Sequence, residues 1–88
     1  MMYHFWWDEN NIEHIANYGV EPYEAEEVID DSPLILRAGK DRYSAYGQTD
    51  SGRYLLVVFA LKPDERIRVI TARDLTAAEK KRLRSRRK

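Results

Sequence analysis

The stretch from Arg53 to Arg84 constrains the fold of this chain more than any other part of it. Residues 55–59, with the sequence LLVVF, form an apolar run of the length of a buried strand. Pro63 follows in a polar turn, where its fixed φ suits the first central position. After the turn, Arg66 and Arg68 alternate with apolar residues and so share one strand face. The stretch therefore predicts a hairpin whose second strand presents arginines.

A basic helix is predicted to follow this hairpin. Thr76 and Glu79 have the spacing of a capping box, in which each side chain bonds the backbone N–H of the other residue. Residues 80–88 then contain seven Lys and Arg residues in nine positions. We expect this end to fray, because a helix of that charge gains little from packing.

The bulk properties of the sequence favour one small domain over residues 1–88. No apolar run approaches the roughly 18 residues of a membrane span, so neither a span nor a signal peptide is expected. The chain has no cysteine, which excludes disulfides and thiolate metal sites and is typical of a cytoplasmic protein.

Charge is segregated along the chain, although the formal net charge is zero. Residues 1–36 hold nine of the fifteen Asp and Glu residues and no Lys or Arg. Residues 37–88 hold all fifteen Lys and Arg residues. Two interpretations follow. The basic part presents a binding face to a phosphate backbone, or the two parts pack together and neutralise each other.

The acidic part predicts a short strand and two helices. An aromatic run at 3–7 is interpreted as a first strand, and Asp8 as the N-cap of a helix that ends near Gly19. The buried stripe of this helix is expected to comprise Ile12, Ile15 and Ala16. A second helix starts at Pro22 and has an apolar stripe of Ala25, Val28 and Ile29. Its glutamates are interpreted as a solvated face or a docking site for a basic partner: Glu24, Glu26 and Glu27.

Asn11, His14 and Tyr18 lie on a different face of the first helix, with no evident core role. Histidine ordinarily titrates near neutral pH, so His14 is a candidate acid or base. The alternative is a surface histidine that is hydrogen-bonded to the sheet.

Three β-segments with short turns run through residues 42–73, which favours an antiparallel meander joined by a strand at 34–38. The predicted fold is α+β: an antiparallel sheet of about four strands, with two N-terminal helices on one face and a basic C-terminal helix. Tyr43 and Tyr46 fall on opposite faces of a regular strand. One of them is a candidate to stack on a base, and packing in the core is the alternative role.

The sequence contains no Walker loop, GxGxxG, HExxH or spaced Cys/His set, so we expect neither a metal nor a cofactor. Arginine chemistry toward phosphate remains. In RNA cleavage the ribose 2′-OH attacks the adjacent phosphorus, and an enzyme can promote this without metal by orientation and charge stabilisation. The candidates for charge stabilisation are Arg66, Arg68, Arg73 and Arg82, and those for proton transfer are His14, Glu79 and a tyrosine.

Several motifs combine in order along nearly the whole chain. They are WDE at 7–9, NIEHI at 11–15, YGV at 18–20, GQT at 47–49, GRYLLVVF at 52–59 and IRVITAR at 67–73, then Thr76 and Glu79. This combination resembles the BrnT-like toxins. Two positions differ from the pattern of many members: Tyr18 stands where they have a histidine, and Leu83 where they have a tyrosine.

The resemblance implies a RelE-like fold and a ribonuclease toxin of a type II toxin–antitoxin pair, which cleaves mRNA and stops translation. It also implies an antitoxin, encoded by a neighbouring gene, that binds the toxin and contacts DNA; a homodimer or a toxin–antitoxin heterotetramer would fit. The residues implied in catalysis are Arg68, Arg73 and Glu79, to which His14 is added. The candidates for RNA binding are Arg66, Arg82, Lys80, Tyr43 and Tyr18.

Other functions remain open from the sequence. One is a nuclease-inactive RNA-binding or regulatory module of the same fold. Another is a protein-interaction module in which segregated charge serves only docking. The third is an enzyme acting on small metabolites, for which no cofactor signature exists.

Overall fold

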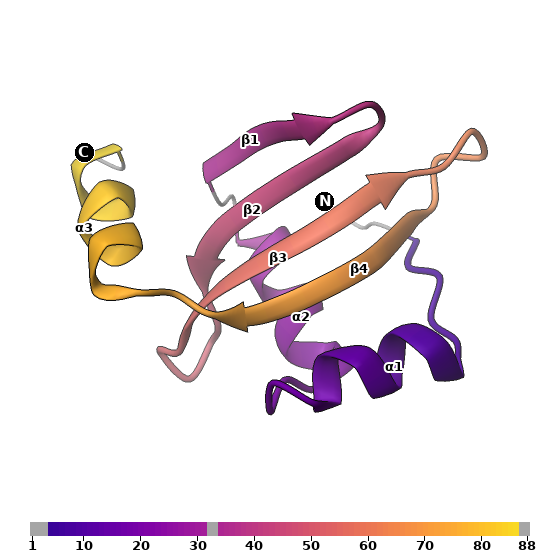
Figure 1. Ribbon diagram of the computed structural model, residues 1–88, viewed down its shortest axis with the longest axis horizontal. Coiled ribbons are helices and arrows are strands. Elements are labelled where there is room, and N and C mark those ends of the chain that lie inside the picture. The colour runs from indigo at the N-terminus through magenta and orange to yellow at the C-terminus, as the bar shows by residue number, and fades with distance from the viewer. Residues whose placement is uncertain (1–3, 32–33, 87–88) are drawn as a thin grey trace.

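The computed structural model describes residues 4–31 and 34–86; residues 1–3, 32–33 and 87–88 lie outside the described part. Figure 1 shows three helices around one sheet. In chain order the elements are α1 (Glu9–Ala16), α2 (Pro22–Asp30), β1 (Leu34–Gly39), β2 (Arg42–Gln48), β3 (Tyr54–Leu61), β4 (Ile67–Asp74) and α3 (Ala77–Arg86). The predicted α+β architecture is therefore confirmed.

The four strands form an antiparallel meander in the order β1-β2-β3-β4. Short turns join them, as predicted from the proline and glycine positions. In the β3–β4 turn, the Glu65 N–H donates to the Lys62 carbonyl at 2.8 Å, with Pro63 at the first central position. Because each strand pairs with the next one in sequence, the first strand, β1, and the last strand, β4, form the two edges of the sheet.

The predicted strand at 3–7 is wrong in extent. Phe5 makes an isolated parallel bridge to Ile67. Two backbone hydrogen bonds hold this segment: Trp6 donates to the Ile67 carbonyl at 2.9 Å, and Ile67 donates to the His4 carbonyl at 2.8 Å. The aromatic run is thus anchored at the start of β4 without becoming a strand, and Tyr3 lies outside the described residues.

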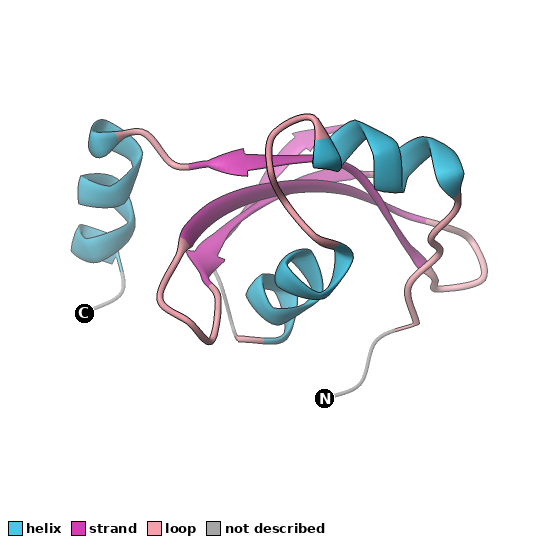
Figure 2. Cartoon of the chain, turned by 90° about the horizontal axis from the view of Figure 1, so that it is seen from below, coloured by secondary structure: helices cyan, strands magenta, loops and turns pink. Residues whose placement is uncertain are grey.

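One sheet face, called here the covered face, packs against α2, while α1 lies along the β4 edge and adds Ile15 to the same core (Figures 1 and 2). The buried strand residues of the covered face are Ala45, Leu55, Val57, Phe59, Ile67, Val69 and Ala72. The predicted α2 stripe of Ala25, Val28 and Ile29 is confirmed as part of this core. The core thus places α1 beside the arginine-bearing strand.

The other sheet face, called here the open face, is not covered by α1 or α2 (Figure 2). At one end of it α3 packs through Leu83, which is 1% exposed and lies in a cluster with Leu56 and Leu75. Leu83 anchors α3, which continues to Arg86. The expected fraying of the basic end stays a prediction, and residues 87–88 lie outside the described part. No helix within the described ranges is long and apolar enough to cross a membrane.

The first helix differs from its prediction in which face it buries. Asp8 is the N-cap, as predicted, and forms a capping box with Asn11. Ile15 is fully buried, but Ile12 is 38% exposed and Ala16 is also exposed. Asn11 is buried instead, because its amide donates to the backbone carbonyls of Trp6 and Val69. A polar residue therefore connects α1 to the sheet edge.

The packing interpretation of the segregated charge is confirmed in part, while the binding of a phosphate backbone stays a prediction. The acidic and basic parts of the chain meet in two ion pairs, Arg53–Glu24 at 3.0 Å and Arg68–Asp8 at 2.8 Å. Glu24, which was interpreted as part of a solvated face, is therefore buried beside Arg53. Other cations lie on the open face, in the turns and on α3, and Arg37 is exposed on the edge strand β1.

Candidate active site

A bulge in β4 brings Arg68 and Arg73 to the same face of the sheet. The two arginines are five residues apart, a spacing that places side chains on opposite faces of a regular strand. In β4, however, Val69 and Thr71 pair with consecutive β3 residues, so Ile70 is an extra residue. The alternation is reset beyond it, and both arginines belong to the open face.

The two arginines stand at different points along the open face. Arg68 pairs with Ala60 and Arg73 with Leu56, four residues apart on β3. Their backbones are therefore about 13 Å apart at the usual rise per strand residue. Two long arginine side chains that start at this separation can contact different phosphates of one nucleic-acid strand.

Arg68 is held at the start of this surface by a carboxylate and an aromatic ring. Its guanidinium donates to both carboxylate oxygens of Asp8, at 2.8 and 3.4 Å. It also lies 5.1 Å from the centre of the Trp6 ring. The hydrogen bond from Arg68, followed by that from the Asn11 backbone, lowers the pKa of Asp8. The pair fixes the direction of the guanidinium while leaving it partly exposed.

A depression between α1 and β4 brings Arg68 together with His14 and Arg42. Its volume is about 370 Å³, and Asn10, Asn11, Val69 and Ile70 complete its lining. Arg42 comes from β2 and pairs with Ala60, which itself pairs with Arg68. Because Ala60 lies between the two arginines and has a small side chain, Arg42 can reach over β3. Two guanidinium groups and one imidazole therefore share one open space.

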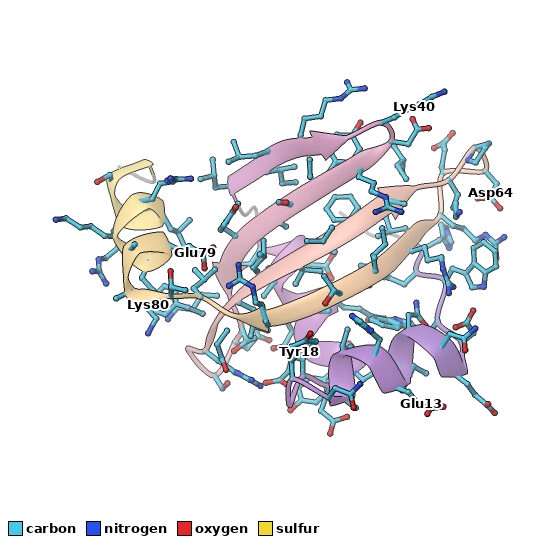
Figure 3. The ribbon with its side chains drawn as sticks, in the orientation of Figure 1. Glu13, Tyr18, Lys40, Asp64, Glu79 and Lys80 are labelled. Atoms are coloured by element: carbon cyan, nitrogen blue, oxygen red, sulfur yellow. The ribbon has the colours of Figure 1, made fainter. Side chains whose placement is uncertain are left out.

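His14 is exposed and faces the sheet across the β4 edge. Its Nε2 atom lies 3.1 Å from the Thr71 hydroxyl oxygen, and its ring meets the Tyr18 ring edge-on, with centroids 5.8 Å apart. Figure 3 shows Tyr18 beneath the middle of β4. His14 thus shares the depression with Arg68, whereas Tyr18 lies toward the other end of β4, where its carbonyl accepts from Arg53. The hydrogen bond to the sheet matches the alternative interpretation of this histidine as well.

Arg73, near the end of β4, forms a second pair with Glu79 of α3, which is labelled in Figure 3. Arg73 donates to both carboxylate oxygens at 2.8 and 2.9 Å. Thr76 and Glu79 also make the predicted capping box of α3. The hydrogen bond from Arg73 is the main cause that lowers the pKa of Glu79 to about 2, and the same bond raises the pKa of Arg73. A carboxylate this acidic is a weak general base.

The structure disperses the other predicted residues. Arg66 lies at the β3–β4 turn, where its Nε donates to Asp64 at 2.7 Å. On α3, the Lys80 amine lies 5.6 Å from the Tyr54 ring centre, and Arg82 is exposed. Tyr43 belongs to the covered face, where it stacks on Phe59 with centroids 5.5 Å apart. Packing in the core, the alternative role, therefore describes Tyr43.

Two contributors were missed by sequence reasoning. Arg42 joins the site only through the pairing of three strands, which no local pattern reveals. Trp6 lies in the aromatic run that was interpreted as a strand, yet its ring contacts Arg66 and Arg68. Within residues 4–31 and 34–86, no group of three or more acidic or histidine side chains is arranged to hold a metal ion.

Comparisons with known proteins agree with this architecture. The profile of the family described as the ribonuclease toxin BrnT of type II toxin–antitoxin systems matches residues 6–79. A crystal structure of the Brucella abortus ribonuclease toxin BrnT is similar, with a TM-score of 0.69 and 23% identity, over 85% of this chain and 99% of that chain. No curated protein sequence matches. Because the profile spans β1–β4 and both N-terminal helices, this chain belongs to the BrnT family of type II ribonuclease toxins.

Proposed function

We propose that this chain is an endoribonuclease that cleaves mRNA without a metal ion and so inhibits translation until a cognate antitoxin neutralises it. The observation that carries this proposal is the depression shared by His14, Arg42 and Arg68. It combines anion-binding groups with a side chain able to move a proton, which is what transesterification of RNA requires.

The arginines act on the phosphate. As the ribose 2′ oxygen bonds to phosphorus, negative charge builds on the non-bridging oxygens, and Arg68 and Arg42 stabilise it. Arg73 holds another phosphate of the same RNA and keeps the RNA strand extended along the open face. Glu79 is assigned to positioning Arg73, since both of its oxygens are engaged by that guanidinium.

His14 accepts the proton of the attacking 2′-OH. Among the residues that line the depression, it is the side chain whose ring nitrogens can both accept and donate a proton. The bond from the 2′ oxygen to phosphorus forms, the bond to the 5′ oxygen breaks, and the leaving oxygen takes a proton from solvent. The products are a 2′,3′-cyclic phosphate and a free 5′-OH. Thr71 orients the imidazole through its hydroxyl.

A second candidate is a nuclease-inactive RNA-binding or protein-interaction module. The observation that favours it is that Arg68 and Arg73 are each engaged by a carboxylate, Asp8 and Glu79. Leu83 is also fully committed to packing, and its side chain cannot transfer a proton. A module of this kind would bind RNA in a salt-sensitive way without turning it over.

The deciding experiment compares purified wild-type protein with Arg68→Ala and His14→Gln, each incubated with RNA in the presence of EDTA. Lys40→Ala is the matched control, since Lys40 is an exposed cation at the β1–β2 turn, across the sheet from β4 (Figure 3). We expect cyclic-phosphate products from the wild type and Lys40→Ala alone. Cleavage that requires an added divalent ion would contradict metal independence, and binding without cleavage would favour the second candidate.

The antitoxin is tested by coexpression. Growth arrest on expression of this chain should be relieved by a short neighbouring gene whose product copurifies with it, as well as by Arg68→Ala. Size-exclusion chromatography of the copurified proteins distinguishes a homodimer from a heterotetramer. Arrest that persists with Arg68→Ala would remove that residue from the proposed mechanism.

A further inference from the structure

Trp6 is the centre of a cluster of cations next to the candidate active site. The guanidinium carbon of Arg66 lies 4.4 Å from the centre of the ring, that of Arg68 5.1 Å and the Lys62 amine 5.6 Å. All three lie within the range of cation–π attraction. The Trp6 N–H donates to the Ile67 carbonyl at 2.9 Å, which anchors the Trp6 backbone at the start of β4.

The ring lines a depression of its own, at the β3–β4 turn. This space has a volume of about 400 Å³, and its other walls are Lys62, Pro63, Asp64 and Arg66. Arg68 borders the cleavage depression and also touches the Trp6 ring. The two depressions are therefore neighbours, joined by Arg68. An RNA strand bound along β4 from Arg73 past Arg68 would reach Trp6 next.

The charges at this second depression favour a nucleotide base together with a single phosphate. Asp64 accepts two hydrogen bonds from Arg66, through the backbone and the side chain, and so neutralises it in part. Lys62 has no carboxylate partner within the described residues and remains free for one phosphate. Aromatic rings and guanidinium planes are the surfaces on which single-stranded RNA stacks its bases.

We propose that Trp6, with Arg66 and Lys62, forms a nucleotide-binding subsite that holds one base of single-stranded RNA beside the cleavage site. The base stacks on the platform of Trp6 and Arg66, and its phosphate contacts Lys62. This subsite rests on the proposed function, because it binds the same RNA strand. It makes Trp6 a determinant of substrate affinity that does not take part in bond breaking.

The test measures binding of a short single-stranded RNA that is 2′-O-methylated throughout, so that it cannot be cleaved by the proposed route. The variants are Trp6→Ala, Trp6→Phe and Lys62→Ala, and the control is Tyr23→Ala, an exposed aromatic residue on α2. We expect Trp6→Ala to weaken binding about 5- to 100-fold without changing its salt dependence. Trp6→Phe should keep most of the affinity, and Lys62→Ala should reduce the salt slope by about one.

Two further measurements separate stacking from folding and from other partners. Thermal unfolding of Trp6→Ala must show the folded state under the binding conditions, and an oligonucleotide with abasic positions should reduce the difference between Trp6→Ala and the wild type. Equal RNA affinity of wild type and Trp6→Ala overturns the subsite, including when antitoxin binding is lost instead. If the wild type cleaves RNA in that case, the proposed function stands; if it neither binds nor cleaves RNA, the proposed function fails first.

Discussion

On the covered face of the sheet, β3 and β4 present Leu55, Val57 and Ala72, all fully buried against α2 and its neighbours. On the open face, β4 presents Arg68 and Arg73, each with a single carboxylate partner and a partly exposed guanidinium. The same backbone therefore carries dense packing on one side and partly exposed charge on the other. Rigid packing behind a strand fixes the backbone positions of its arginines, and the ion pairs fix the directions of their side chains.

Arginine 53 shows the contrast within one residue type. Its guanidinium donates to Glu24, to Asp74 and to the Gly19 carbonyl, and so joins α2, β4 and the loop after α1. Arg68 has one carboxylate and faces a depression. We infer that Arg53 stabilises the fold and that Arg68 serves the reaction. The predictions below test this division between the two regions.

The largest effect is expected for Leu55→Ala, on the covered face. The substitution leaves a cavity in the core and should lower the free energy of unfolding by about 2–5 kcal/mol, measured by urea denaturation. The control is Leu61→Ala, on the same strand and face but 45% exposed, for which the change should be much smaller. Equal losses for the two leucines would mean that the covered face is not the main source of stability.

Arg68→Ala should greatly reduce the rate of RNA cleavage but leave the stability of the fold nearly unchanged. Loss of a group that stabilises transition-state charge reduces the rate about 100- to 1000-fold, measured as initial rates of RNA cleavage. Its pair with Asp8 is partly exposed, so the melting temperature should hardly move. A large drop in melting temperature with normal cleavage per folded molecule would reverse the assigned roles of Arg68 and Arg53.

Arg53→Ala should destabilise the fold by about 1–2 kcal/mol, because the substitution leaves the largely buried Glu24 carboxylate without its partner. Cleavage per folded molecule should stay at the wild-type level. Denaturant melts together with rates corrected for the folded fraction check both statements. Arg37→Ala, an exposed arginine on β1, is the matched control and should alter neither quantity.

The smallest effect concerns pH and Glu79. The pKa of this carboxyl is about 2 in the folded state and near 4.5 when unperturbed, so its interaction with Arg73 stabilises the fold above about pH 4.5 and is lost as pH falls toward 2. Allowing for the exposure of Arg73, the contribution is about 1 kcal/mol. Unfolding of wild type and Glu79→Gln at pH 7, 4 and 2.5 should show a difference that shrinks with acid. A constant difference would assign the effect to the helix cap alone.

Local signals in the sequence predicted much of this fold. The apolar run at 55–59, Pro63 and the Thr76–Glu79 capping box each act through neighbouring residues, and they became the predicted strand, turn and helix start. The α2 stripe was predicted for the same reason. Short connections then left a meander as the simplest topology, and the structure has it.

What the sequence did not predict depends on partners distant along the chain. The burial of Asn11 requires the Val69 carbonyl, and that of Glu24 requires Arg53. Arg42 joins His14 only because two strand pairings place Ala60 between it and Arg68. Such contacts leave no periodicity to detect. Arg68 and Arg73 were candidates from the sequence, but their position on the same face of the sheet was not predicted.

The extra residue at Ile70 means that the length of β4 matters as much as its composition. Deleting one residue there would keep every charge in the chain and restore a regular ladder, yet it would turn Arg73 and the departure point of α3 toward the helices. The side chains of β4 before the deletion would keep their native faces, and those after it would point to the opposite faces. A chain altered in this way would keep its basic composition, its turns and its capping box, and still present its two arginines to different sides of the molecule.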